Sequence, residues 1–454
     1  MRKLVLIAFV LLLTLTLIPE SVMAQEDMTI TWWITPWRIT TPDMDPDESP
    51  DGEQFADYVS RKFEEKHPNV NVEYQVVTHS GREEQATAAM FAGNPPNVYW
   101  EQGSPNPEWV EEGQLEPITD YLTEEDMEDF IPYTLETGKF GDDYYMWPWN
   151  NSNNGMGSSL ILNVERFEER GVSIPEGRSW TVEEFLEVAK ELSYDSDGDG
   201  EIDRYAITLA ADDTLNMLGW LHRFGATMLN EDNTEFVLNS PEGVEALQLM
   251  VDMIHEYEIA PPGASGMGVY DAINMFHSGR AAMGYGGIYE IGRIDRYYKS
   301  GDLEDPFDVR LAQFPHDPEV GPVAYQVNGG FLVFKEDDEA KRDMAMEFAS
   351  FITGPEMIGM LEDLLYITSR ESVNETLTFE NVDPYTDTDI MTEVEVYLEA
   401  ISHGVEYYGP AEVPTGEAVS YLTSAIQAAL SLDKTPQEAL DDFVENANRV
   451  VFED

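Results

Sequence analysis

The sequence predicts an α/β protein with a parallel sheet near its N-terminus and a long helical C-terminal portion. Three observations predict this class. Short apolar runs alternate with helically spaced segments between residues 28 and 100, and the alternation resumes between 158 and 352. The residues after 374 carry mostly helical spacing instead. A chain of 454 residues is long enough for two or three domain-sized units.

The first elements follow the order strand, helix, strand, helix, strand. They are expected at residues 28–34, 53–66, 70–77, 83–91 and 97–100. Phe55, Tyr58 and Phe63 share one face of the first helix, which Pro68 ends, and Gly93 ends the second helix. This order implies parallel strands with right-handed crossovers. In open sheets of this kind ligands collect beyond the carboxyl ends of the strands.

The later part of the chain continues the alternation and then becomes helical. Aromatic residues crowd 144–149, and several asparagines follow them. The spacing predicts a helical stretch near 121–137, strands at 158–163, 205–209, 281–285, 309–314 and 324–334, and helices at 182–192, 213–224, 241–257, 338–352, 354–364, 415–430 and 435–451.

The composition excludes several classes of function. Asp and Glu number 89 against 25 Lys and Arg, a net charge of −64, which disfavours nucleic acid and anionic membranes as partners. Disorder does not follow from this charge, because 42% of the residues are hydrophobic and can build a core. The chain has no cysteine, which excludes disulfides, thiolate metal sites, cysteine nucleophiles and lipid attachment at Cys.

The acidic residues are spread along the whole chain rather than gathered in a tail. A hydrated acidic coat with few lysines suits a protein that works in high salt, where dense counterions screen self-repulsion. From this distribution of charge we hypothesise a halophilic source.

The N-terminus predicts a secretory signal peptide, residues 1–24. Arg2 and Lys3 precede an apolar run of about 15 residues, shorter than the roughly 20 that a membrane span needs. Val22 and Ala24 occupy the small-residue positions of a cleavage site before Gln25. The mature chain is expected to be exported, without a transmembrane segment.

The order of several motifs resembles the family 1 extracellular solute-binding proteins, the maltose-binding-protein-like receptors of ABC importers. The resemblance covers nearly the whole mature chain. It rests on the segments 63–68 (FEEKHP), 92–98 (AGNPPNV), 162–167 (LNVERF), 179–185 (SWTVEEF), 276–283 (FHSGRAAM) and 329–330 (GG). The family's lipoprotein cysteine is missing, which suggests a periplasmic or secreted receptor.

The resemblance implies a two-lobed periplasmic-binding-protein fold of type II, with the ligand in the cleft between the lobes. By analogy the N-terminal lobe comprises residues 25–147 and 323–371, and the C-terminal lobe comprises 148–322 and 372–454. Closure of the lobes around a sugar would present the receptor, expected to be a monomer, to a membrane permease, its protein partner.

A calcium site is predicted at residues 195–203 (DSDGDGEID). Carboxylates at loop positions 1, 3, 5 and 9, with a glycine at 6 and an apolar residue at 8, resemble the calcium loop of an EF-hand, and a further acidic residue stands at position 7. The five acidic residues are Asp195, Asp197, Asp199, Glu201 and Asp203. Position 12 is Ala206, so the bidentate Glu is absent, and an ordinary Asp/Gly turn is the alternative.

Aromatic and polar residues at strand ends form the predicted carbohydrate surface, because sugar rings stack on aromatic planes while their hydroxyls need amide and carboxylate partners. The aromatic candidates are Trp33, Trp37, Trp147, Trp149, Trp220, Tyr289, Tyr407 and Tyr408. The polar candidates are Arg82, Glu101, Gln102, Asn150, Asn151, Asp212, Asp213 and Asn328. By position in the family, Trp37 and Glu101 would line one lobe, and Trp149, Asp212, Tyr289 and Tyr407 the other lobe or the hinge.

Other functions are less well supported by the sequence. No nucleophile-elbow, zinc-protease or phosphate-loop motif is present, and seven histidines lack metal-ligand spacing. The alternative class is a secreted carbohydrate-active enzyme or a calcium-dependent lectin. The residue count does not exclude the paired carboxylates of a glycoside hydrolase, but among 89 acidic residues such pairs are easily found by chance. Tyr407 and Tyr408 also resemble the tyrosine pair of ferric-ion receptors.

Overall fold

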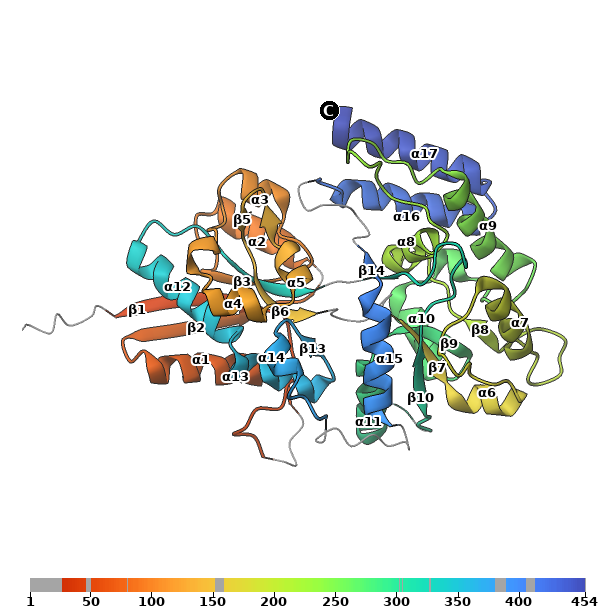
Figure 1. The fold of residues 1–454 in the computed structure, drawn as a ribbon, viewed down its shortest axis with the longest axis horizontal. Coiled ribbons are helices and arrows are strands. Elements are labelled where there is room, and N and C mark those ends of the chain that lie inside the picture. The colour runs from red at the N-terminus through yellow and green to blue at the C-terminus, as the bar shows by residue number, and fades with distance from the viewer. Residues whose placement is uncertain are drawn as a thin grey trace, which may run out of the picture.

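The chain folds into two α/β lobes that lie side by side in a computed structural model (Figure 1). The structure describes residues 27–45, 50–79, 81–151, 159–301, 303, 305–325, 328–379, 389–405 and 413–453. One lobe is built on a six-stranded sheet and the other on a four-stranded sheet. Among the described residues no helix is long and apolar enough to cross a membrane.

The sheet of the first lobe has the strand order β13-β6-β12-β3-β1-β2. Its strands are β1 (Met28–Ile34), β2 (Val70–Val76), β3 (Val98–Gln102), β6 (Trp147–Asn151), β12 (Gly329–Val333) and β13 (Ile367–Thr368). β1 pairs in parallel with β2 and β3, as the sequence predicts, because each connection is a helix. β12 runs antiparallel to β3 and β6, so the sheet is mixed rather than purely parallel.

Two long helices, several short ones and a hairpin surround this sheet. They are α1 (Gln54–Lys66), α2 (Arg82–Phe91), α3 (Pro107–Glu111), η1 (Thr119–Tyr121), α4 (Glu124–Asp129), α5 (Pro132–Glu136), β4 (Lys139–Phe140), β5 (Asp143–Tyr144), α12 (Glu339–Ile352), α13 (Pro355–Ile358), η3 (Gly359–Leu364) and α14 (Glu371–Asn374). The helical stretch expected near 121–137 is three short pieces. Thr123 and Asp126 form a capping box that starts α4, and Pro132 can only begin a new helix.

The second lobe is built on the sheet β10-β7-β9-β8. Its strands are β7 (Ser159–Asn163), β8 (Tyr205–Ile207), β9 (Ala281–Gly286) and β10 (Val309–Ala312). β8 and β9 are parallel, whereas β7 is antiparallel to both of its neighbours. The carboxyl ends of β8 and β9 therefore lie at the same edge of the sheet.

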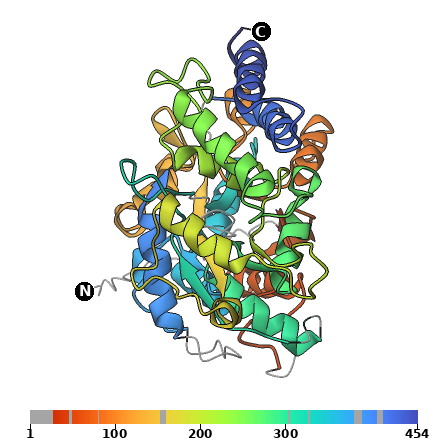
Figure 2. The ribbon, with the colours of Figure 1, turned by 90° about the vertical axis from the view of Figure 1, so that its right-hand side faces the viewer.

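Helices surround this second sheet and form most of the lobe. They are α6 (Val164–Arg170), α7 (Val182–Leu192), α8 (Thr214–His222), α9 (Pro241–His255), η2 (Ala264–Gly266), α10 (Val269–His277), α11 (Tyr289–Ser300), α15 (Ile390–Ser402), α16 (Gly416–Leu430), α17 (Pro436–Asn448) and η4 (Arg449–Glu453). The last two long helices pack on each other and on α9, and Figure 2 shows them at one end of the lobe. Four of these helices, α6, α10, α11 and α15, have no counterpart of their own among the expected elements.

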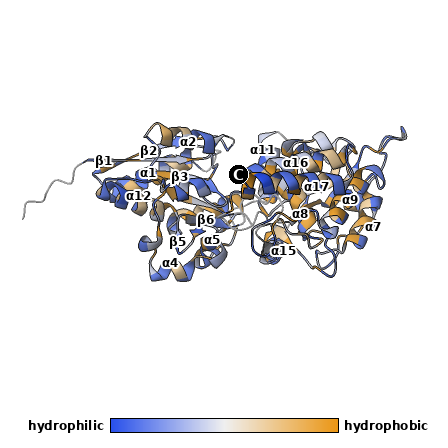
Figure 3. Cartoon of the chain, turned by 90° about the horizontal axis from the view of Figure 1, so that it is seen from above, coloured by the Kyte–Doolittle hydropathy of each residue, from blue (hydrophilic) through white to orange (hydrophobic). Residues whose placement is uncertain are grey.

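Sheet membership shows how the chain passes between the lobes. β6 lies in the first sheet and the next described strand, β7, in the second; β10 lies in the second sheet and β12 in the first. A small parallel pair, β11 (Ala324–Tyr325) with β14 (Gly404–Val405), lies apart from both sheets. The expected strand 324–334 is thus two strands. Helices of both lobes carry hydrophilic and hydrophobic residues side by side (Figure 3).

Candidate functional site

Three tryptophans meet at one face of the first-lobe sheet. Trp37 follows the end of β1, Trp100 lies in β3 and Trp149 in β6. The ring centroid of Trp37 lies 5.5 Å from that of Trp100 and 4.8 Å from that of Trp149, both edge to face. All three side chains are buried. Each such ring pair stabilises the fold by about 0.5–1.5 kcal/mol beyond the burial of its apolar surface, so the three rings form a rigid cluster.

A buried ion pair lies beside Trp100, whose ring centroid is 5.3 Å from the Arg82 guanidinium. Arg82, at the start of α2, donates from Nη2 to Oε1 of Glu101 at 2.5 Å, and the two side chains are only 16% and 5% exposed. Gly81 turns the chain into this helix at φ 75°, and Nη1 of Arg82 also donates to the His79 carbonyl. The backbone N–H of Gln102 donates to Glu101 at 2.8 Å. Burial raises the pKa of Glu101, although Arg82 acts in the opposite direction.

Several buried donors around this cluster have no partner among the described residues. They are the indole N–H groups of Trp37, Trp100 and Trp149 and the Nε–H of Arg82. An unsatisfied buried donor costs about 1–3 kcal/mol, so four of them in one neighbourhood are expensive in a purely structural cluster. The region is therefore equipped to donate to a ligand rich in acceptor oxygens.

The asparagines of the site are partly used by the fold. Oδ1 of Asn150 accepts from the Gly329 N–H at 2.7 Å, where the pairing of β6 with β12 is irregular. Asn328 donates to the Thr134 carbonyl. Nδ2 of Asn150, Oδ1 of Asn151 and Oδ1 of Asn328 are buried without a partner in the described chain. Each amide thus keeps one polar atom that the fold does not satisfy.

In the second lobe, Asp212 and Asp213 lie shortly after β8. Asp213 caps α8 by accepting from Asn216 and is buried, whereas Asp212 is exposed. Burial raises the pKa of Asp213 to about 6. A small cavity of about 20 Å³ adjoins Asp213, Tyr285 and Glu290, with room for roughly one water molecule.

Tyr289 connects this lobe to the tryptophan cluster. Its ring stacks in parallel on Tyr366, with centroids 5.6 Å apart, and Tyr366 lies 5.7 Å from Trp37. Tyr289 begins α11 in the second lobe, while Tyr366 immediately precedes β13 in the first. The chain of rings from Trp37 to Tyr289 therefore joins the two lobes, and the predicted residues Trp37, Trp149 and Tyr289 do come together.

Other predicted residues lie elsewhere. Trp33 faces the opposite side of the first sheet, against Tyr99 and Trp109. Trp220 lies in the core of the second lobe and donates to Tyr285. Trp147 is buried in the same hydrophobic core as Trp37, Trp100 and Trp149, and its indole N–H also has no partner among the described residues, but no ring contact joins it to those three. Tyr407 and Tyr408 lie outside the described residues.

Three residues of the cluster are absent from the sequence-based set: His79, Trp100 and Tyr366. The His79 ring lies 5.8 Å from that of Trp100 and 6.4 Å from that of Trp37. Trp100 directly precedes Glu101, so its position at a strand end could have indicated it. Tyr366 could not have been found in this way, because only the tertiary fold brings the β13 strand beside β6.

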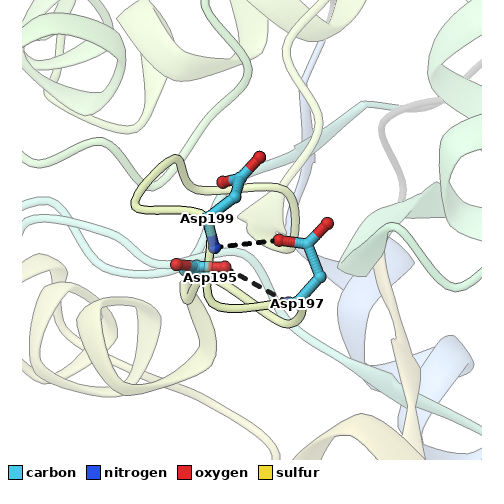
Figure 4. Close-up of side chains that lie close together, drawn as sticks. All are labelled: Asp195, Asp197 and Asp199. Carbon is cyan, nitrogen blue, oxygen red and sulfur yellow. Dashed lines mark hydrogen bonds between the residues drawn. The ribbon is translucent and has the colours of Figure 1, made fainter.

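The predicted calcium loop brings together three of its five acidic residues. One carboxylate oxygen from each of Asp195, Asp197 and Asp199 lies within 4.8 Å of the others, around one turn of the loop (Figure 4). Gly200, at φ 100°, provides the sharp turn, and its N–H and that of Gly198 lower the pKa of Asp195.

Glu201 and Asp203 do not join that group among the described residues. Asp203 accepts from Ser196 and pairs with Arg204 instead. Hard oxygen donors suit calcium, but three are fewer than the six to eight that it usually takes.

Comparison with known proteins identifies a family over most of the chain. Residues 45–358 match the bacterial extracellular solute-binding proteins. A mannitol-binding protein of Pseudomonas aeruginosa is 24% identical over 232 residues, which are 50% of each chain. The match thus spans about half the length of that curated relative.

Solved structures share the fold over nearly the whole chain. An ABC substrate-binding protein of Listeria monocytogenes, in complex with cycloalternan, has a TM-score of 0.72 and 21% identity over 94% of this chain and 99% of that one. A solute-binding protein of Thermotoga lettingae bound to α-D-tagatose has a TM-score of 0.73 and 21% identity over 93% and 99%. The two-lobed fold expected from the sequence is confirmed.

Proposed function

The chain belongs to the bacterial extracellular solute-binding proteins, and from that membership we propose that it is a carbohydrate receptor serving the permease of an ABC importer. The family works outside the cytoplasm and binds solutes, so the chain is a receptor and not an enzyme. The signal peptide at residues 1–24, with the mature chain starting at Gln25, is part of the same proposal.

One observation carries the choice of a carbohydrate: the tryptophan cluster with its unpartnered donors. Trp37, Trp100 and Trp149 bring three aromatic rings together with indole N–H groups that no described residue accepts, although the rings are buried in this structure. Sugars offer both apolar C–H faces and many hydroxyl oxygens. A ligand of this kind would accept from the indole N–H groups where a movement of the lobes lets it reach the rings.

The charges of the site favour an uncharged ligand. Arg82 is already paired with Glu101, and Asp212 adds an exposed carboxylate on the other lobe. The Asp212 carboxylate would repel an anionic solute. Arg82 would not offset this repulsion, because its guanidinium is already paired with Glu101. The names of the relatives, with mannitol, cycloalternan and tagatose, support a neutral polyhydroxylated ligand, and we propose an oligosaccharide.

Closure of the lobes would complete the site. The stack of Tyr289 on Tyr366 provides a contact between the lobes, around which the remaining surfaces can approach each other. The closed receptor, a monomer in this proposal, would then dock on the permease.

We also propose that Asp195, Asp197 and Asp199 bind calcium in a structural role. The support is their mutual approach within 4.8 Å and the lowered pKa of Asp195, which keeps that carboxylate charged. Since the loop joins α7 to β8, an ion would stabilise the second lobe rather than take part in ligand chemistry.

A thermal-shift screen of sugars in high salt tests the carbohydrate proposal. A neutral mono- or oligosaccharide should raise the Tm of the wild type and raise that of Trp37→Phe by less, because the variant loses one donor. Trp33→Phe, on the opposite face of the same sheet, should respond as the wild type does. A panel in which only non-sugar solutes raise the Tm would refute the proposal.

A further inference from the structure

The small cavity of the second lobe lies where α10 packs on β9 (Figure 1). Its volume of about 20 Å³ holds roughly one water molecule. Part of the lining is apolar and comes from Ile161, Val269, Ala272, Ile273 and Phe276. The lining also includes four buried side chains that carry oxygen: Thr208, Asp213, Tyr285 and Glu290. A space of this size with such a lining is suited to one small polar or charged particle.

One of the two carboxylates at the cavity, Glu290, has its charge balanced by the fold. Nη1 of Arg293 donates to its Oε1 at 2.5 Å, and its Oε2 lies 3.1 Å from Nε2 of His277. Burial acts to raise the pKa of Glu290, but Arg293 and His277 lower it overall, so this group stays ionised. Glu290 therefore needs no further cation.

The other carboxylate, Asp213, has no such compensation. It accepts from the backbone N–H and the side-chain amide of Asn216, and no ion pair joins it to a cation among the described residues. The neighbouring charge that acts on it is the carboxylate of Asp212. Asp213 is only 6% exposed, and a buried carboxylate without a positive partner is strongly unfavourable.

Thr208 gives a second, independent indication of a ligand. It lines the cavity and is 1% exposed, yet no hydrogen bond joins its hydroxyl group to another described residue. A buried hydroxyl group of this kind is unfavourable unless something in the cavity binds it. The Tyr285 hydroxyl accepts from the indole N–H of Trp220 and keeps a lone pair for a further partner.

The sum of the charges decides what kind of particle fits. With histidine counted as neutral, Asp213 and Glu290 against Arg293 leave one negative charge at the cavity. A water molecule would bind the hydroxyl groups but leave this charge, whereas a divalent ion would reverse it. Alkali cations, which are hard, take oxygen ligands such as carboxylates and hydroxyl groups.

We propose that this cavity binds one monovalent alkali cation, Na⁺ or K⁺, with Asp213 and Thr208 as its principal ligands. The ion would join the segment after β8 to α10, β9 and the start of α11, and so stabilise the second lobe. The inference goes beyond the proposed function and does not depend on which solute the receptor binds.

The test measures Tm at pH 8 in NaCl, KCl or choline chloride at one fixed chloride concentration. EDTA is present throughout, so that calcium does not contribute. A cation at a hundred times its dissociation constant should raise the Tm of the wild type by about 2–3 °C beyond the general response of the acidic coat. Asp213→Asn should lose this additional rise.

Asp232→Asn is the matched control, because Asp232 is exposed in the same lobe and its replacement removes the same charge. The control should show the full rise of the wild type. Equal rises in Asp213→Asn and Asp232→Asn would overturn the cation site and leave the cavity to a water molecule.

Thr208→Val keeps the test decisive if Asp213→Asn does not fold, because valine has nearly the shape of threonine without its hydroxyl group. Its additional rise should be smaller than that of the wild type, and an undiminished rise would overturn the proposal. A rise specific to Na⁺ or to K⁺ would support the site and identify its ion. Since no sugar is present, these results leave the proposed function untouched.

Discussion

Removing Arg82 should expose the energetic cost of the buried carboxylate next to the tryptophan cluster. In Arg82→Met, Glu101 keeps its burial at 5% exposure but loses the cation 2.5 Å away. Breaking a buried pair in this way costs about 3–5 kcal/mol. The shift in Tm is this loss divided by the unfolding entropy, which is about 2.1 cal/mol/K per residue. For 454 residues that unfold together, the Tm should fall by about 3–5 °C.

The pH dependence follows from the direction of the pKa shift. Burial already raises the pKa of Glu101 in the native protein, and loss of Arg82 raises it further. A raised carboxyl pKa means that the folded state binds the proton more tightly than the unfolded state. The destabilisation is therefore full at high pH and shrinks as the pH falls through the raised pKa of Glu101, because the carboxyl then takes up a proton.

Calorimetric scans of three variants at pH 8 and pH 5 in high salt measure this effect. Arg82→Met with Glu101→Gln should recover most of the lost Tm at pH 8, because no buried charge remains. Arg61→Met is the control: Arg61 is 43% exposed, and its exposed ion pairs are worth about 1 kcal/mol or less. A Tm for Arg82→Met within 1 °C of that for Arg61→Met, or a double variant no better than the single one, would refute the reasoning.

Three further predictions address other parts of the molecule. Asp213→Asn should reduce the loss of stability that the wild type shows between pH 4 and 7. The buried carboxyl, with a pKa of about 6, binds its proton more tightly in the folded state, so its contribution to stability is lost as the pH rises through that pKa. Equal pH profiles of Tm for the variant and the wild type would contradict this. Calcium should raise the Tm of the wild type, and Asp195→Asn should abolish the rise, whereas equal Tm values with calcium and with EDTA would exclude the site. The Tm should climb between about 0.1 and 2 M KCl, as the Debye length falls from about 10 Å to below 3 Å around 64 net charges; equal stability at both concentrations would reject the halophilic hypothesis.

The sequence predicted the parallel part of the first sheet well because each signal there is local. The alternation at 70–76 and the helical face of Phe55 and Phe63 are visible without tertiary information, and α1 and β2 follow them closely. The antiparallel insertion of β12 between β3 and β6 depends on contacts more than 170 residues apart in the chain. No local pattern encodes such a pairing.

The candidate site likewise contains residues that local sequence patterns predict and residues that only the tertiary fold brings together. The position of Trp37 and Glu101 after strands predicts both, and the structure places Trp37 in the tryptophan cluster and pairs Glu101 with Arg82, whose guanidinium lies 5.3 Å from the Trp100 ring. Trp33 was predicted for the same reason, but strand alternation turns it to the other face of the sheet.

The central claim is that a neutral sugar binds at the tryptophan cluster between the lobes. Titration of the intrinsic tryptophan fluorescence with maltotriose, mannotriose, tagatose and mannitol in high salt tests it most directly. The account predicts a saturable change with one ligand per chain for at least one of these compounds, weakened in Trp37→Phe but not in Trp33→Phe. A flat response to every sugar, together with a saturable response to a charged non-sugar solute, would contradict it.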